Sequence, residues 1–213
     1  MSDKQWKFTG ETKIHFGITL KRIQATVEFK LKCCIVIKKG ELGGWIEKES
    51  NLSDDAWVSG NAEVFGNAEV FGNAWVSDNA RVCGDAMVLG NAEVYGNARA
   101  YGDAKVFGNA VVYDNAEVYG DAKVYGNARV LGNAKVSGNA LVKSSEDYCV
   151  YKNTWSSFRW FTYTKSNKMW RAGCFCGTGA ELIAKAYKDS KKSGKCYEAI
   201  VKAQEAIEKA TDA

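Results

Sequence analysis

The chain has 213 residues, of which 46% are hydrophobic and 25% charged, a composition that is typical of a folded soluble protein and excludes extensive disorder. Its longest apolar run, near residues 33–37, is far shorter than the roughly 18 residues that a membrane helix needs, and a net charge of +4 does not by itself predict nucleic-acid binding. Seven cysteines and the absence of an apolar leader in residues 1–10 favour a cytoplasmic location.

The N-terminal segment, 1–55, contains no internal repeat. Residues 8–10 and 14–29 favour two or three strands with a turn near Gly17, and a glycine-rich segment follows at residues 40–46. A repeat structure exposes unpaired strand edges at its ends and therefore needs a cap. We interpret residues 1–55 as an N-terminal β cap.

A six-residue repeat occupies the centre of the chain. From Ala56 to Val142 the pattern Ala-x-Val-x-Gly-Asn recurs fifteen times, and Ala100 is the only residue that replaces the Val. Alternation places Ala and Val on one face of a short strand, while Gly-Asn supplies a bend. Each repeat unit therefore predicts one short strand and one corner.

The substitutions within the repeat predict three units per coil. Asp replaces Asn at Asp85, Asp103 and Asp121, which lie three units apart, and Asp replaces Gly at Asp78 and Asp114, which lie six units apart. Fifteen units then form five coils of a triangular prism, about 24 Å long at roughly 4.8 Å per coil. The same period aligns asparagines in a corner column, where amide groups can hydrogen-bond between coils: Asn61, Asn79, Asn97, Asn115 and Asn133.

This pattern resembles the hexapeptide-repeat superfamily of left-handed parallel β-helices, best known from trimeric acyltransferases. In that family glycine usually follows the aliphatic residue directly, whereas here Phe65 or Tyr95 takes that place and glycine comes one residue later. The segments at 8–11, 20–23 and 40–47, followed by Gly-Asn-Ala repeats, also look like the opening of a family of phage and prophage proteins. The first resemblance implies a left-handed coil, and the second implies a phage accessory role.

Residues 143–213 differ in composition from the repeat and carry a net charge of +5, from 13 Lys or Arg and 8 Asp or Glu. Strands are expected at 148–151, 160–164 and 169–175. Thr178 and Glu181 form the capping-box pattern of a helix start. A second helix is expected to carry an apolar face that comprises Tyr197, Ile200, Val201 and Ile207.

The predicted fold is therefore mainly β: a left-handed parallel β-helix of about five triangular coils with an N-terminal β cap and a small C-terminal α+β module. The expected domains are residues 1–55 for the cap, 56–142 for the hexapeptide-repeat β-helix and 143–213 for the α+β module.

Little in the sequence points to catalysis. The acyltransferases use a histidine base on a coil or inserted loop, but these repeats contain no histidine and the chain's single one, His15, lies in the predicted cap. Cys174 and Cys176 are too closely spaced for a common zinc knuckle. We expect no catalytic residue, metal or cofactor.

The residues predicted to lie on the surface indicate more about function than the candidate catalytic residues do. An aromatic residue follows the inward aliphatic position in six successive units and predicts an outward aromatic belt for oligomer contact or binding: Tyr95, Tyr101, Phe107, Tyr113, Tyr119 and Tyr125. Trp and Arg residues typical of binding hot spots suggest the partner-binding surface: Trp57, Trp75, Arg159, Trp160, Trp170 and Arg171.

These features predict a non-enzymatic binding protein, a phage-derived accessory factor that binds or inhibits a host or defence protein in the bacterial cytoplasm. A homo-oligomer, dimer or trimer, is expected, with neither a membrane nor a nucleic acid as partner. One alternative is a sponge that sequesters a small nucleotide-like ligand between subunits. Another is an acyltransferase-like enzyme, which the missing histidines argue against.

Overall fold

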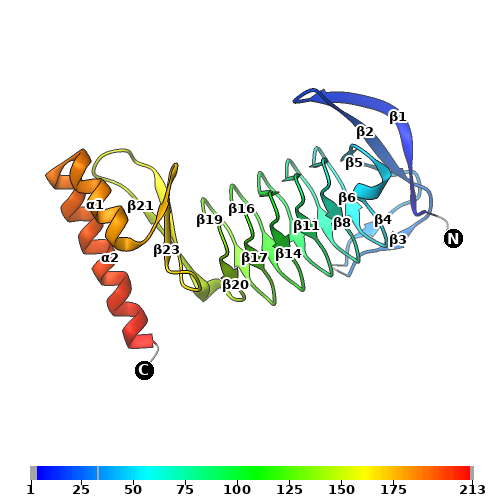
Figure 1. The fold of residues 1–213 in the computed structure, drawn as a ribbon. Helices are drawn as coiled ribbons and strands as arrows, with labels where there is room; N and C mark the ends of the chain where they lie inside the picture. The colour runs from blue at the N-terminus through cyan, green and yellow to red at the C-terminus, as the bar shows by residue number, and fades with distance from the viewer. Residues whose placement is uncertain (1–3, 33, 212–213) are drawn as a thin grey trace. The chain divides into compact units, whose positions relative to one another are not determined.

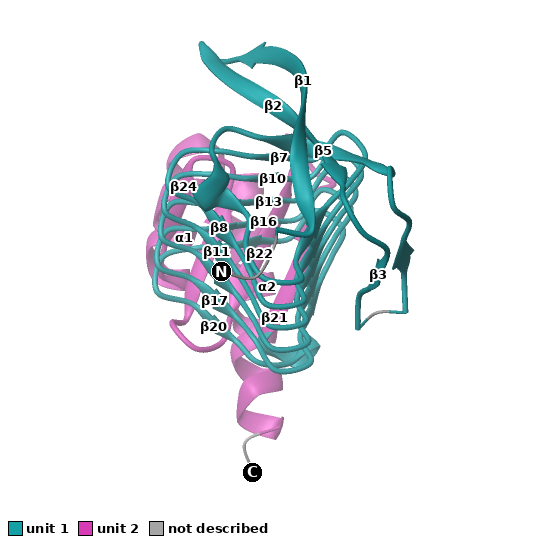
Figure 2. Cartoon of the chain, turned by 90° about the vertical axis from the view of Figure 1, so that its right-hand side faces the viewer, with its two compact units in different colours: residues 1–147 teal, residues 148–213 magenta. Residues whose placement is uncertain are grey.

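The structure is a computed structural model that describes residues 4–32 and 34–211. The chain folds into two compact units that divide between Asp147 and Tyr148. Figure 1 shows the chain coloured along its sequence, and Figure 2 shows the two units in different colours. Each unit has its own set of sheets, and each is described separately below.

The repeat folds as fifteen very short strands, one for each sequence unit. Each of the first twelve strands pairs in parallel with the third strand after it along the chain, as Trp57 with Trp75 and Val82 with Ala100. The predicted three-sided solenoid of about five coils is therefore confirmed. Its strands are β6 (Trp57–Val58), β7 (Glu63–Val64), β8 (Glu69–Val70), β9 (Trp75–Val76), β10 (Arg81–Val82), β11 (Met87–Val88), β12 (Glu93–Val94), β13 (Arg99–Tyr101), β14 (Lys105–Val106), β15 (Val111–Val112), β16 (Glu117–Tyr119), β17 (Lys123–Val124), β18 (Arg129–Val130), β19 (Lys135–Val136) and β20 (Leu141–Val142).

The solenoid core consists of the Ala and Val columns that the repeat predicts. The first Ala of all fifteen units, the Val of fourteen of them and Ala100 in the remaining one are each at most 2% exposed. Burying one Val side chain stabilises a fold by about 1.5–3 kcal/mol relative to leaving it exposed. Because the core residues are small, the coils can stack closely around a narrow interior.

The corners explain the position of glycine in this repeat. Gly66, for example, has φ 71°, a left-handed conformation that glycine adopts without strain. Asp78 and Asp114 occupy equivalent corners at φ 59° and 60°. Their carboxylates accept hydrogen bonds from the backbone N–H of the next coil, at 2.9 Å from Gly96 and 3.1 Å from Gly132. Asp is less suited than glycine to positive φ, but its carboxylate adds a hydrogen bond between two coils.

The expected amide contacts between coils are present in the asparagine column. Asn61 donates to Asn79 and Asn97 donates to Asn115, each from Nδ2 to Oδ1 over 3.3 Å. A second column contains the same contact, from Asn91 to Asn109 over 2.9 Å. These ladders satisfy exposed polar groups and hold the corners in register.

The parallel coil begins before the hexapeptide pattern does. Strand β5 (Leu42–Ile46) pairs in parallel with β7, and Ile46 lies opposite Val64 at the one-coil spacing of the later strands. Gly44 stands where later coils have Ala, and a Cβ there would lie 2.7 Å from Val58 Cγ1. The buried Asn51 donates through Nδ2 to the carbonyl groups of Gly66 and Ala68, at 3.1 and 2.8 Å. Part of the segment predicted as a cap is thus an irregular first coil.

An antiparallel hairpin extends one face of this unit. Strands β1 (Trp6–His15) and β2 (Ile18–Ala25) meet at Phe16 and Gly17, both with positive φ, as a tight hairpin turn requires. Strand β2 pairs with β5, so the hairpin continues the sheet formed by β7, β10, β13, β16 and β19. The short pair β3 (Phe29–Lys30) and β4 (Val36–Ile37) and two 3₁₀ turns, Glu49–Asn51 and Ser145–Asp147, complete the unit.

The C-terminal unit is the expected small α+β module. Its antiparallel sheet comprises β21 (Tyr148–Lys152), β22 (Trp160–Thr164), β23 (Met169–Ala172) and β24 (Phe175–Gly177), followed by helices α1 (Gly179–Asp189) and α2 (Lys191–Thr211). Its buried core contains Phe161, Tyr163, Trp170, Leu182 and Val201.

The two helices agree with the sequence in part. The capping box is confirmed, because Thr178 Oγ1 accepts from the N–H of Glu181 at 3.3 Å and Glu181 Oε2 accepts from the N–H of Thr178 at 2.8 Å. The predicted apolar face of α2 is wrong at Ile207, which is 52% exposed. The buried face instead includes two polar residues, Gln204 and Glu208.

Candidate binding site in the C-terminal module

The loop between β21 and β22 is shaped by a single buried side chain. Asn153 is 2% exposed, and its Oδ1 accepts from the backbone N–H groups of Trp155 at 3.2 Å and Ser156 at 2.9 Å. Its Nδ2 donates to the Tyr197 hydroxyl at 3.2 Å. The Asn153 N–H donates to the Arg159 carbonyl at 2.9 Å, which closes the loop. An asparagine that bonds to the backbone just after it stabilises a turn without regular secondary structure.

The same loop exposes large side chains. Phe158 is 65% exposed and Trp160 is 41% exposed, and Arg159 lies between them on the surface. Phe158 has φ 53°, and the Lys152 Nζ lies 5.2 Å from the centroid of the Trp160 ring. The loop therefore presents two aromatic rings and a guanidinium group from a backbone that is held by internal hydrogen bonds.

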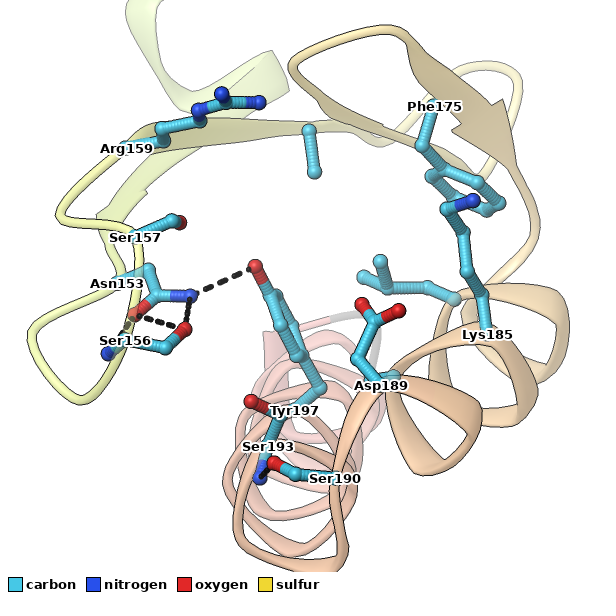
Figure 3. Close-up of a pocket in the computed structure, with 13 residues that line it drawn as sticks. Asn153, Ser156, Ser157, Arg159, Phe175, Lys185, Asp189, Ser190, Ser193 and Tyr197 are labelled. Carbon is cyan, nitrogen blue, oxygen red and sulfur yellow. Dashed lines mark hydrogen bonds between the residues drawn. The ribbon is translucent and has the colours of Figure 1, made fainter.

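A pocket of about 330 Å³ lies beside this loop and is lined from the loop, the sheet edge and both helices. Figure 3 shows the Tyr197 hydroxyl pointing into it between Asn153 and Asp189. Arg159 and Lys185 line it as cations and Asp189 as an anion, and four serine hydroxyls add polar groups: Ser156, Ser157, Ser190 and Ser193. No carboxylate of the described residues pairs with either cation. The pocket can thus accept a carboxylate or another acidic group.

The predicted hot-spot residues of this module separate into exposed and buried ones. Arg159 and Trp160 lie on the exposed loop, and Arg171 is half-buried on β23. Trp170 is 2% exposed and packs against Tyr163, its cross-strand partner, with ring centroids 4.8 Å apart. The expectation of an exposed hot spot at Trp170 is therefore wrong, because this ring belongs to the core of the module.

The two solenoid tryptophans occupy neighbouring coils, as three units per coil require, but neither is a freely exposed ring. Trp57 is completely buried, because Phe29 from the β3–β4 segment packs edge-on against it with centroids 5.6 Å apart. The expectation of an exposed hot spot at Trp57 is thus wrong. Trp75 is half-buried, and its Nε1 donates to Ser59 Oγ at 3.0 Å.

The aromatic belt is arranged as three stacked pairs, one in each corner column. Each pair joins neighbouring coils, and all six rings are half-buried. The centroid distances are 5.2 Å for Tyr95–Tyr113, 4.8 Å for Tyr101–Tyr119 and 5.2 Å for Phe107–Tyr125. Stacking covers ring faces and stabilises the coil interface. A further role of the belt in oligomer contact stays a prediction.

Sequence reasoning missed most of the residues that form the pocket. Asn153 and Ser156 carry a local signal, since an Asn three residues before a Ser in a polar segment is typical of a side-chain-stabilised turn. Lys185 and Asp189 are four residues apart on α1, a spacing that places them on one helix face. The sequence places Tyr197 only on an apolar helix face, and its hydrogen bond to Asn153 spans 44 residues of sequence.

Within residues 4–32 and 34–211, no three His, Cys, Asp or Glu side chains are placed to share a metal ion. His15 lies on the hairpin, 3.5 Å from Glu63 Oε2 through its Nε2 and 20% exposed. No helix in the described part of the chain is long and apolar enough to cross a membrane.

Stacked parallel coils with a six-residue repeat define the class of β-solenoid repeat proteins. In agreement, a family model described as the YdcK β-solenoid repeat matches residues 80–96, a span of about one coil. No curated protein matches the chain.

Proposed function

We propose that this protein is a non-enzymatic binding protein that recognises another protein through the 153–160 loop and the adjoining pocket, with the solenoid as a rigid element. The observation that carries this proposal is the loop itself, which exposes Phe158 and Trp160 at 65% and 41% while the buried Asn153 fixes its backbone. Aromatic and arginine side chains often dominate binding energy. Ordering a flexible loop on binding lowers affinity, so a loop that already holds these side chains in place favours binding.

The chemistry of the pocket favours an acidic partner segment. Arg159 and Lys185 line it against the single carboxylate of Asp189, and residues 143–213 carry a net charge of +5. An Asp or Glu side chain of the partner would bind the guanidinium through paired hydrogen bonds. The serine and tyrosine hydroxyls donate to the second lone pairs of the carboxylate oxygens or bind backbone groups of the partner segment.

A cellular location and an origin are proposed as well. We place the protein in the bacterial cytoplasm as a phage-derived accessory factor acting on a host or defence protein. Support comes from the resemblance of residues 8–11 and 40–47 to phage proteins and from the cysteines, since Cys34, Cys83, Cys149, Cys174, Cys176 and Cys196 are all free.

The test begins with affinity purification from bacteria and mass spectrometry of co-eluting protein, followed by titration of the purified partner. We expect Arg159→Ala to weaken binding about thirtyfold, as truncation of a hot-spot arginine typically does. Arg99→Ala, an exposed arginine on strand β13, serves as the matched control and should leave affinity unchanged. Equal effects of the two variants, or binding that survives removal of residues 148–213, would refute the proposed surface.

A second candidate is sequestration of a small nucleotide-like anion, and the size of the pocket favours it. A volume of about 330 Å³ falls at the lower end of the range for ligand pockets, roughly 300–1,000 Å³. Phe175 supplies an aromatic wall, and Arg159 and Lys185 supply positive charge. Mass spectrometry of the denatured, freshly purified protein distinguishes the two candidates, because a sponge releases a small metabolite and needs no protein partner.

A further inference from the structure

A second pocket, of about 450 Å³, lies at the start of helix α1 in the same module. The first residues of α1, the aromatic residues Tyr163 and Trp170 and the C-terminal part of α2 line it. It shares no lining residue with the first pocket. This pocket is therefore independent of the surface proposed for the protein partner.

One buried amide group in this pocket has no partner. Gln204 is 1% exposed, and its Oε1 accepts from the Tyr151 hydroxyl at 2.5 Å. Burial is the main cause that raises the pKa of Tyr151 to about 12, so this hydroxyl keeps its proton and donates it. Gln204 Nε2 has no hydrogen-bond partner among the described residues. A buried donor without an acceptor costs about 1–3 kcal/mol, which a bound acceptor would recover.

Two further donors belong to the helix start. Thr178 caps α1, and its capping box engages the N–H of Glu181, but Gly179 and Ala180 lie in the first turn, where backbone N–H groups have no acceptor within the helix. Both residues line the pocket. The N-terminal end of a helix also carries partial positive charge, and it therefore favours a carboxylate.

The charged groups around the pocket have both signs. Lys168 and Lys209 line it together with Glu205 and Glu208, and Lys168 Nζ lies 3.9 Å from Glu208 Oε2. A hydrogen bond also joins Glu208 to the Tyr163 hydroxyl, whose pKa is raised mainly by burial and also by this contact. Glu205, by contrast, is exposed. Two carboxylates disfavour a doubly charged phosphate, whereas they suit a ligand that also carries an ammonium group.

We propose that this second pocket binds a small zwitterion of the α-amino-acid class. The carboxylate of the ligand accepts hydrogen bonds from Gln204 Nε2 and from the first N–H groups of α1. Its ammonium group lies toward Glu205, and an apolar side chain contacts the Trp170 and Tyr163 wall.

The proposal is tested on the full chain by isothermal titration calorimetry with four probes: L-leucine, L-leucine methyl ester, 4-methylpentanoate and inorganic phosphate. The ester lacks the carboxylate and 4-methylpentanoate lacks the ammonium group. We expect L-leucine to bind at least tenfold more tightly than the other three. Absence of L-leucine binding, or equal binding of the ester, overturns the proposal.

Variants then locate the site. Gln204→Glu preserves the shape and the acceptor for Tyr151 but removes the donor, and it should weaken L-leucine binding at least thirtyfold. Glu205→Gln removes the exposed carboxylate toward which the ammonium group lies, and it should weaken L-leucine binding severalfold without affecting folding. Lys192→Gln, an exposed lysine at the start of α2, is the control. If Gln204→Glu fails to fold, Glu205→Gln decides, and unchanged binding in that variant refutes the site.

Discussion

The buried carboxylate of Glu63 offers a sharp test of how the hairpin is joined to the solenoid. Its side chain is 8% exposed, and three basic groups surround it: Lys13 Nζ at 2.8 Å, Arg81 Nε at 3.1 Å and His15 Nε2 at 3.5 Å. Lys13 and His15 lie on β1, Glu63 on β7 and Arg81 on β10. This one carboxylate therefore connects the hairpin to two successive coils.

We expect Glu63→Gln to destabilise the N-terminal unit by about 2 kcal/mol. A hydrogen bond between charged groups contributes about 1.5–3 kcal/mol. Lys13 Nζ lies within hydrogen-bond distance of Glu63 Oε1, whereas Glu63 Oε2 forms an ion pair with Arg81 but has no hydrogen-bond partner among the described residues. The cost of burying the charge offsets part of the combined gain. The Lys13 and Arg81 side chains are 31% and 33% exposed, so water can partly solvate them once the carboxylate is lost. This exposure keeps the expected loss below the roughly 3–5 kcal/mol typical of breaking a fully buried ion pair.

Urea denaturation followed by circular dichroism measures this loss. Glu69→Gln is the matched control, because Glu69 occupies the corresponding first position of strand β8 but is exposed. A double-mutant cycle with Arg81→Met should recover part of the loss as coupling between the two residues. A change in Glu63→Gln of less than about 0.5 kcal/mol would refute the reasoning, since it would mean that desolvation cancels the whole network.

Other perturbations test a corner, the half-buried carboxyl group of Glu93, the histidine and the oligomeric state. Asp78→Ala should cost about 1–2 kcal/mol, because Ala is strained at positive φ and lacks the bond to Gly96, and denaturation should show a smaller loss for Asp78→Gly. Burial raises the pKa of Glu93, so its native carboxyl binds a proton more tightly than the unfolded one, and its contribution to stability is lost as pH rises through that raised pKa. Glu93→Gln should therefore be more stable than the wild type at pH 7, and the difference should vanish at about pH 4. His15→Ala should leave every function of the protein intact, partner affinity included, and loss of an activity in the folded variant would favour the enzyme alternative. Light scattering at micromolar protein should give a dimer or trimer, and a monomer mass would contradict the predicted oligomer.

The solenoid could be predicted from the sequence because the residues that form its core recur at a fixed spacing of six. The Ala and Val columns and the spacing of Asp85, Asp103 and Asp121 give three units per coil without any knowledge of long-range contacts. The irregular first coil could not be predicted from the repeat, because Gly44 stands there in place of an Ala. In addition, the Asn51 side chain, and not a backbone N–H, donates to the carbonyl groups of the next coil. Neither substitution preserves the repeat pattern.

The candidate sites were harder to derive, because they depend on contacts between distant segments. Alternation along a strand places Trp57 outward, but Phe29 covers it from a segment outside the repeat. On α2, the polar side chain of Gln204 is typical of a solvated helix face, yet it is buried through its contact with Tyr151, 53 residues earlier. A local pattern can predict which face of a strand or helix a side chain lies on. Whether that face is buried depends on residues far away in the sequence.

The one-coil spacing of every ladder also restricts how the solenoid can change in length. Inserting three repeat units adds one coil, about 4.8 Å, and returns each later residue to its own face and corner. Inserting a single unit preserves the Ala-Val core but rotates everything after it by one side of the triangle. Such an insertion between Tyr101 and Tyr119 would separate that stacked pair, whose centroids are now 4.8 Å apart. The solenoid can thus be shortened or lengthened only in whole coils if its surface pattern is to persist.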